Sequence, residues 1–459
     1  MNESVIKVAE KDKTLSAGKL FYNWFAANIG IMGFVFGTMV VNYKLSFFQA
    51  IIACFAGAMS FTISGWVAVI GQKQGITTFK LSRAPFGTKG NKVPNAIAWV
   101  NMIGWLAVNI ITGTLLLVSL FQLASLEKSN FTLSVCLIVF SGLVILSGLL
   151  KEDVLAKIQT WLSWAFGIMT GLILIIFFLK ANWHQALNLP KGNWITGVLP
   201  AISTVAAGSG ISWSMAAADW GAYVTNKTKP GATFWSTTIG GALPLFVLMV
   251  GGVLLSTIEP KLAVSNDPFG TMYAILPVWL GPLYFLVAAG GLVPQCIISF
   301  RSARINLATI GIKLSQKTSL IVHGMIVTII PVYVLFFAGN FLTTFELFLN
   351  FLGICLASWV VIFLCDSLMF RKQGYDMRLL DPVSAYHYNW RGIISWIGAT
   401  ITGFMFTNND IWNGPCARGI FRNNSLGVFV AAFVAIVMMM LWNIIDKQKR
   451  NTTSSSEVD

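Results

Sequence analysis

Charged side chains are scarce in this chain: Asp, Glu, Lys and Arg make up 10% of its 459 residues, whereas 56% are hydrophobic. An average soluble domain carries about 25% charged residues. The apolar residues gather in many runs that are long enough to cross a bilayer, which takes about 20 residues in a helix. The composition therefore excludes an ordinary soluble protein and predicts an all-α polytopic membrane protein surrounded by lipid.

Histidine and loop cysteine are also rare, which argues against catalysis and against a disulfide framework. The three histidines lie in a loop, a span and a loop (His184, His323 and His387), and no HExxH motif or close pair of intramembrane carboxylates accompanies them. Of the six cysteines, Cys416 alone falls in an expected loop. We expect neither an enzyme, nor a metal site, nor a cofactor. A channel would need a selectivity filter, and no repeated loop in the sequence resembles one.

Acidic residues are few, 17 against 31 Lys and Arg, and the net charge is +14. In a soluble protein this excess would suggest nucleic acid as a partner, but in a membrane protein basic residues gather in cytoplasmic loops. With the N-terminus inside, 21 basic residues fall on the inner side and 7 on the outer side. The count predicts a plasma (inner) membrane protein with both termini cytoplasmic and no nucleic-acid partner. The N-terminus shows no cleavable signal-peptide pattern.

Hydropathy predicts about twelve transmembrane helices between two short polar tails. The expected spans are 21–43, 47–71, 95–123, 131–150, 155–179, 196–222, 232–256, 282–311, 318–338, 342–370, 392–408 and 424–446. Residues 1–20 would be a cytoplasmic tail, 21–446 the transporter domain, and 447–459 a disordered cytoplasmic tail.

Glycines interrupt the first and the sixth expected spans. The sixth contains Gly208, Ser209 and Gly210, and the first contains NIGIMGFVFG around Gly33. Glycine is unfavourable inside a helix, and paired interruptions five spans apart indicate an inverted repeat of five plus five helices. The last two spans would then be peripheral. The alternative is that these glycines only let helices pack closely.

Polar and aromatic side chains near the interruptions suggest a substrate site at the bilayer midplane. Trp105 and Asn109 share a face of the third span, Ser212 and Trp213 follow the sixth-span glycines, and Gln295 follows a Gly-Pro segment in the eighth. Asn101 fits an interhelical hydrogen bond instead. No Lys or Arg falls near the midpoint of the first, third or sixth span. Because a charged ligand would need a counter-charge there, we expect a neutral, flat, polar heterocycle.

Five segments of the chain match a known pattern, namely GQKQGITTFKLSRAPFGTKG, GWLAVN, AADWGAYV, FLNFLGICLASW and CDSLMFRK. Through them the chain resembles the nucleobase–cation symporter-1 family, specifically its purine–cytosine permease branch. It implies the leucine-transporter-type fold and uptake of a nucleobase such as cytosine or a purine with H⁺ or Na⁺. By position it implies a substrate site made of Gly33, Phe34, Trp105, Asn109, Gly210, Ser212, Trp213 and Gln295. Allantoin, hydantoins and vitamin-like pyrimidines or pyridines remain alternative substrates.

The coupling cation is expected to be H⁺ rather than Na⁺. Sodium-coupled relatives place hydroxyl residues at an eighth-helix turn that reads GGLVPQ in this chain, from Gly290 to Gln295. Three carboxylates associated with spans are candidates for the proton, namely Asp219, Glu346 and Asp366. For each carboxylate the alternative is a structural role, in which it caps a helix or forms an ion pair with a nearby Lys or Arg. Arg301 and Arg304 receive no role beyond reaching the cytoplasmic interface.

Overall fold

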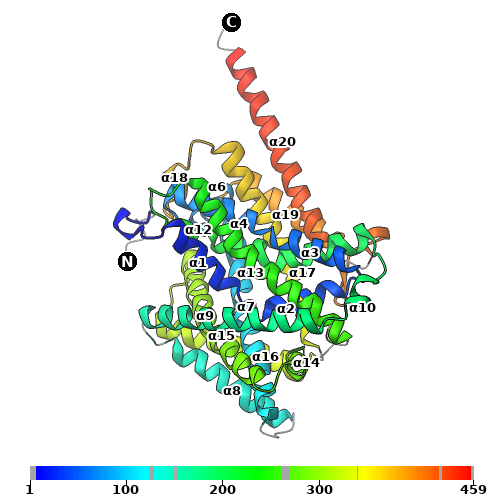
Figure 1. Cartoon of the computed structure of the whole chain (residues 1–459). Helices are drawn as coiled ribbons and strands as arrows, with labels where there is room; N and C mark the ends of the chain where they lie inside the picture. Colours follow the sequence, from blue (N-terminus) through cyan, green and yellow to red (C-terminus); the bar gives the residue numbers. More distant parts are fainter. Residues whose placement is uncertain are drawn as a thin grey trace.

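The computed structural model describes residues 7–123, 129–148, 150, 152–260, 262, 268–338, 340–422 and 426–455. Helices account for nearly all of this part of the chain (Figure 1). Within it, ten helices are long and apolar enough to cross a membrane, and the bent pair α1 and α2 supplies one more span. The structure therefore confirms an all-α polytopic fold.

The helices follow the order expected for two repeats of five spans. The first repeat comprises α1 (Ala17–Asn28) with α2 (Met32–Val41), α3 (Phe47–Ala58) with α4 (Phe61–Gln74), α7 (Lys92–Leu123), α8 (Asn130–Ser147) and α9 (Glu152–Lys180). The second comprises η2 (Trp194–Val198), α11 (Leu199–Ala206), η3 (Ala207–Ile211) and α12 (Ser212–Gly221) as one span, then α13 (Pro230–Ile258), α15 (Leu280–Ile310), α16 (Gln316–Phe336) and α17 (Phe341–Cys365). Short helices lie between them: α5 (Thr78–Leu81), α6 (Arg83–Phe86), α10 (Trp183–Leu187), α14 (Pro268–Ile275), η5 (Asp366–Phe370) and α18 (Met377–Leu380).

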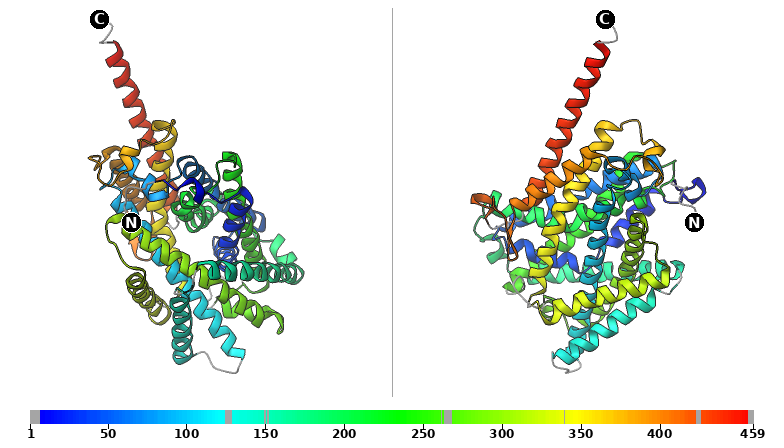
Figure 2. Two further views of the ribbon diagram at one scale, coloured as in Figure 1. Left: turned by 90° about the vertical axis from the view of Figure 1, so that its left-hand side faces the viewer. Right: turned by 180° about the vertical axis from the view of Figure 1, so that it is seen from behind.

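Two further helices, α19 (Trp390–Met405) and α20 (Gly427–Ser455), pack on α17 and on each other. The predicted span 392–408 corresponds to α19, which has 16 residues. It ends before a two-stranded hairpin of β1 (Asn408–Asn409) and β2 (Trp412–Asn413). Both views of Figure 2 show α20 projecting beyond the other helices.

Close packing of α2 on α13 explains one glycine of the first span and one glycine of α13. A Cβ on Gly37 would overlap the Met249 carbonyl of α13, and a Cβ on Gly252 would overlap the Phe34 carbonyl of α2. Small residues let transmembrane backbones approach in this way. Gly37 is therefore a packing residue, whereas the bend of 63° in the first span lies before it, between Asn28 and Met32.

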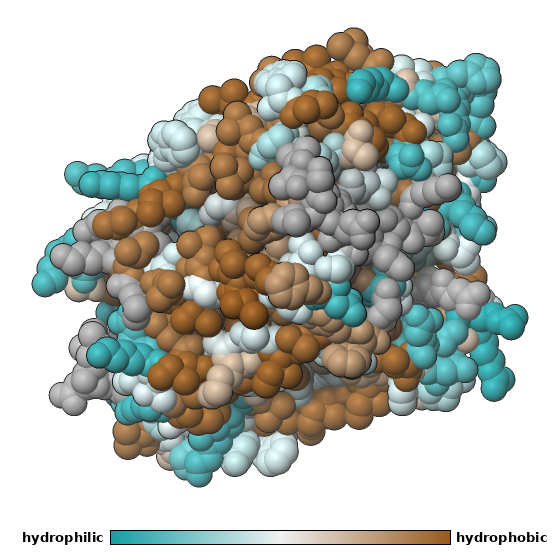
Figure 3. Space-filling model, turned by 90° about the horizontal axis from the view of Figure 1, so that it is seen from below, coloured by the Kyte–Doolittle hydropathy of each residue, from teal (hydrophilic) through white to brown (hydrophobic). Residues whose placement is uncertain are grey.

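The outer surface carries the apolar side chains that a bilayer requires. Large hydrophobic residues are exposed on several helices, among them Phe131, Ile138, Trp161, Leu179 and Ile329. Figure 3 shows hydrophobic side chains spread over much of one face, with hydrophilic ones gathered near its margins. Apolar patches of this extent are unusual on a soluble monomer and match contact with lipid.

Both ends of the chain carry regular structure or backbone contacts. α20 continues to Ser455 and so covers most of the segment 447–459 that was predicted to be disordered; residues 456–459 lie outside the described part of the chain. The reason is that residues 447–450, Lys-Gln-Lys-Arg, are good helix formers that extend an existing helix, which is easier than starting one. At the other end, the Val8 N–H donates to the Gly75 carbonyl at 2.7 Å, and Leu15 forms a bridge with Val224.

Candidate functional site

The two interrupted spans meet at an internal cavity of about 620 Å³. Its lining comes from α1, α2, α7, η3, α12 and α15, with single residues from α9 and α13. The lining residues used below are Met32, Gly33, Phe36, Asn101, Trp105, Asn109, Ser212, Trp213, Asp219, Gln295, Ser299, Arg301, Ser302 and Arg304.

Serines of the second span satisfy the backbone groups that the η3 interruption releases. Ser209 has non-helical dihedral angles, φ −122° and ψ −107°. The Gly210 N–H donates to the Ser60 hydroxyl at 3.0 Å, and the Ser64 hydroxyl donates to the Gly210 carbonyl at 2.8 Å. A broken helix is tolerated at membrane depth only where such partners or a wet cavity exist. The predicted break in the sixth span is therefore confirmed.

Two tryptophans from different helices face this cavity. Trp105 of α7 is held by edge-to-face contacts with Phe345 and Phe348 of α17, at centroid distances of 5.6 and 6.1 Å. Trp213 of α12 packs edge-on against Trp24 of α1 at 5.7 Å. Each ring is thus held at a steep angle to neighbouring aromatic rings, which is an arrangement that aromatic pairs prefer. Flat surfaces fixed in this way suit a planar ligand.

Amide side chains supply the polar part of the cavity. Asn109 is 7% exposed, and within the described residues its side chain makes no hydrogen bond to protein. The Gln295 amide donates a long bond of 3.5 Å to the Ala27 carbonyl beside the first break. Asn101, by contrast, bonds to Ser212 at 3.4 Å and to Met215 at 3.5 Å, as expected for an interhelical contact. The amides of Asn109 and Gln295 therefore retain the capacity to bond a ligand.

The cavity extends from the helix interruptions toward the side of the molecule on which residues 7–16 lie. Its lining continues along the C-terminal halves of α12 and α15, and Leu15 bridges to Val224 just beyond α12. On the other side the helices are joined. The Tyr43 hydroxyl lies 2.7 Å from the Thr204 hydroxyl and donates to Glu346 at 3.0 Å, and Phe36 packs on Phe345. The cavity is thus closed on that side.

Known proteins identify the class of molecule. A family model described as permease for cytosine/purines, uracil, thiamine and allantoin matches residues 7–430. The chain belongs to this permease family. It is similar to the putative purine-cytosine permease YxlA of Bacillus subtilis, with 25% identity over 428 residues, 90% of this chain and 89% of the relative.

Solved structures agree on the fold of the permease. Mhp1, a nucleobase-cation-symport-1 family transporter, superposes with a TM-score of 0.72 in a closed conformation with bromovinylhydantoin bound. Its inward-facing conformation gives a TM-score of 0.74. In both cases the identity is 16%, and the match covers 96% of this chain and 96% or 94% of that chain. The family match makes the chain a transporter and not an enzyme, and the solved structures show that its fold is the inverted repeat.

Most of the predicted substrate residues of the permease line the cavity, but two do not. Phe34 packs against Phe177 of α9 at 5.8 Å and against Gly251 of α13. Gly210 lies against the backbone of Ser60. Neither is among the cavity-lining residues, whereas Gly33, Trp105, Asn109, Ser212, Trp213 and Gln295 are. Sequence position could not separate them, because neighbouring residues of one helix turn face different directions.

The three candidate carboxylates lie in different places. Asp219 lines the cavity, and its Oδ1 accepts the Thr78 N–H at 2.8 Å, so it caps the short helix α5. Glu346 belongs to the closed side, where it accepts from Tyr43. Asp366 forms an ion pair with Arg371. Asp219 and Asp366 thus have the kinds of partner that the structural interpretation predicted, a helix N-terminus and an arginine, whereas Glu346 bonds to a tyrosine hydroxyl instead. Of the three, Asp219 also faces the cavity.

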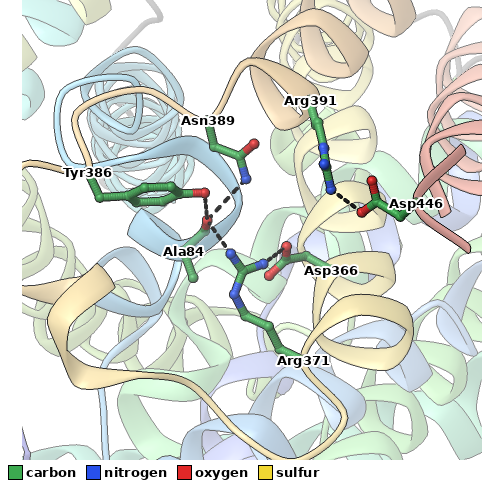
Figure 4. A network of polar contacts seen from close by, with 7 residues as sticks. All are labelled: Ala84, Asp366, Arg371, Tyr386, Asn389, Arg391 and Asp446. Atoms are coloured by element: carbon green, nitrogen blue, oxygen red, sulfur yellow. Dashed lines mark hydrogen bonds and ion pairs between the residues drawn. The ribbon is translucent and has the colours of Figure 1, made fainter. Parts of the chain in front are cut away.

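The RAPFG segment anchors the short helices that lie at one end of the bundle. Three donors converge on the Ala84 carbonyl of α6, namely the Arg371 guanidinium at 3.1 Å, the Tyr386 hydroxyl at 3.3 Å and the Asn389 amide at 3.3 Å (Figure 4). Burial raises the pKa of the Tyr386 phenol, so it stays protonated and able to donate. This motif therefore has a structural task outside the cavity.

Sequence reasoning missed the charged part of the cavity. Arg301 and Arg304 line it together with Ser299 and Ser302, whereas the sequence predicted a cavity lined by uncharged side chains. A signal existed: Gln295, Ser299 and Ser302 are spaced by four and three residues, which places them on one face of a helix. That spacing continues the substrate face of α15 toward the arginines.

Proposed function

We propose that this permease imports a neutral, planar nucleobase such as cytosine or a purine across the plasma membrane. The observation that carries the proposal is the meeting of Trp105, Trp213, Asn109 and Gln295 in one cavity at the helix interruptions. A stacked aromatic contributes about 1–3 kcal/mol to holding a base. Amides both donate and accept, which suits the mixed edge of a base.

Transport would proceed by alternating access. With the predicted topology, the side on which residues 7–16 lie is cytoplasmic, so the cavity faces inward. The Tyr43, Thr204 and Glu346 contacts would then be the closed outer barrier. Opening that barrier requires α2 and α11 to separate from α17, while the inner half of the cavity closes. Rocking of one repeat against the other around a fixed site is the general mechanism in such folds.

The proposed coupling ion is H⁺. A Na⁺ site in this fold needs hard oxygen ligands beside the first-helix break. At the corresponding turn, a Cβ built on Gly290 would meet the Leu162 side chain, which offers none. A proton needs a carboxylate instead, and Asp219 is the candidate that faces the cavity.

Uptake of labelled cytosine into proteoliposomes tests the substrate and the ion together. An inward pH gradient alone should drive accumulation, and a Na⁺ gradient alone should not. Unlabelled adenine, allantoin, a hydantoin and a pyridine vitamin are then added as competitors. Adenine should compete most strongly. Strong competition by allantoin or the hydantoin with none by adenine would replace the nucleobase assignment, and accumulation driven by Na⁺ without a pH gradient would contradict proton coupling.

A further inference from the structure

The end of the cavity nearest residues 7–16 is basic. Arg301 and Arg304 both line it, and the hydroxyls of Ser299 and Ser302 lie on the same stretch of α15. Within the part of the chain that the structure describes, the Arg304 guanidinium has no ion-pair or hydrogen-bond partner. A partly buried guanidinium usually has a counter-ion, because taking it out of water is unfavourable.

The carboxylate in the lining does not neutralise this end. Asp219 is the one acidic residue among the described lining residues, and its Oδ1 is occupied by the Thr78 N–H. Lys80 is close enough to interact with the same carboxylate. The Arg304 guanidinium therefore faces a cavity whose one described carboxylate already has partners, and its positive charge is left for a ligand to balance.

The spacing along α15 separates this basic end from the amide that contacts the base. Arg304 is nine residues beyond Gln295, a rise of about 13 Å at 1.5 Å per residue. Long helical side chains lean toward the helix N-terminus, so the guanidinium extends back toward Gln295. A nucleobase alone is too short to touch both groups. A heterocycle with an attached acidic group could place its ring at Trp213 and its anion at the arginines.

We propose that the inner end of the cavity is an anion-accepting subsite for a flat heterocycle that bears a carboxylate or a phosphate. This inference rests on the proposed function, because the ring of the ligand would bind where the nucleobase binds. It extends that function to ligands that enter or leave on the cytoplasmic side. Arginine holds both groups well, because its planar fork donates two parallel hydrogen bonds. Such a ligand is either a transported acidic base or a nucleotide that occupies the site without being transported.

A matched pair of ligands isolates the charge. Purified full-length protein in detergent, where both sides are accessible, is loaded with labelled cytosine and challenged with a pyrimidine carboxylate or with its uncharged carboxamide. The carboxylate should compete about tenfold better than the carboxamide, as a charge-assisted hydrogen bond predicts. Arg304→Gln should bring that ratio close to one when both competitors are measured against the variant's own cytosine affinity, and Arg304→Lys should keep part of the preference.

Lys317→Gln is the control, because it removes the same charge from an exposed position at the start of α16. A ratio near one in the native protein, or one that Arg304→Gln leaves intact, overturns the subsite while cytosine binding still stands. Carboxylate binding without cytosine binding would instead overturn the proposed substrate and keep the subsite. Counterflow of labelled carboxylate and competition by a nucleoside monophosphate distinguish a transported acid from a retained nucleotide.

Discussion

At the scale of single residues, the function of a buried polar group depends on whether another protein group already bonds to it. Asn101 and Asn109 lie on the same helix, and both line the cavity. Asn101 is bonded to α12, whereas Asn109 makes no side-chain hydrogen bond within the described residues. An amide buried without a partner is unfavourable, so its persistence at Asn109 indicates that a ligand or water completes it.

The tryptophans provide the first prediction. Trp213→Ala and Trp105→Ala should each weaken cytosine binding by about 1–3 kcal/mol, because each removes one stacking surface. Trp161→Ala is the control, since Trp161 is 71% exposed on the lipid-facing side of α9. Equilibrium binding to the purified protein measures the loss. Native affinity in both cavity variants would contradict the stacking role.

A second prediction separates a structural carboxylate from a coupling one. The Asp366 side chain is 3% exposed in its pair with Arg371, so Asp366→Asn leaves a buried guanidinium and should destabilise the protein by about 3–5 kcal/mol. The same change at Asp446, 20% exposed in its pair with Arg391 (Figure 4), should cost at most about 1 kcal/mol. Denaturation midpoints give both values. A stable Asp366→Asn protein that transports without a pH gradient would make Asp366 the coupling group.

At the scale of the helix, the interruption in the sixth span depends on close approach to α4. A Cβ on Gly210 would overlap the backbone of Ser60 and Phe61, which cannot move aside as a side chain can. Gly210→Ala should therefore lower stability by about 1–3 kcal/mol and reduce uptake. Gly171→Ala on α9 is the matched control, because nothing lies within 4 Å of its Cβ position. Thermal unfolding and uptake that are equal in the two variants would refute this packing role.

The closed side depends on a few hydrogen bonds between elements. Tyr43→Phe removes the two hydrogen bonds that join the residue just after α2 to Thr204 and Glu346. Each hydrogen bond contributes about 0.5–1.5 kcal/mol, so the loss of two should make the outer side open about 5- to 150-fold more often. Labelling of Met32→Cys, a cavity-lining position, by an impermeant thiol reagent outside the cell measures this. Tyr333→Phe, exposed on α16, should leave the rate unchanged; no increase with Tyr43→Phe would remove the barrier role.

At the scale of the whole molecule, the distribution of basic loops predicts the orientation of the bundle. Lys89 is exposed beside α6, and Ile411 is 69% exposed in the hairpin after α19. In a Cys416→Ser background, Ile411→Cys should react with an impermeant thiol reagent on intact cells, and Lys89→Cys should react only after permeabilisation. The reverse pattern would invert the topology and make the cavity face outward.

The sequence by itself determined the class of the protein, the number of spans to within the short α19, and the two interruptions. Spans and helix interruptions can be recognised from short stretches of sequence. A bilayer imposes its thickness on every span, and a broken helix needs residues such as glycine that permit the break. Of the eight residues that the sequence predicted for the substrate site, six line the cavity, since their types are rare at membrane depth.

Only the tertiary structure decided which of those residues share a cavity and which have structural partners. Phe34 packs into α9 and Gly210 against α4, because the crossing of helices selects the face that each turn presents. The three carboxylates found partners on segments far away in the sequence. The basic end arises because the C-terminal half of α15 and α12 line the same cavity. Such contacts depend on how the whole bundle packs, and no local pattern contains that information.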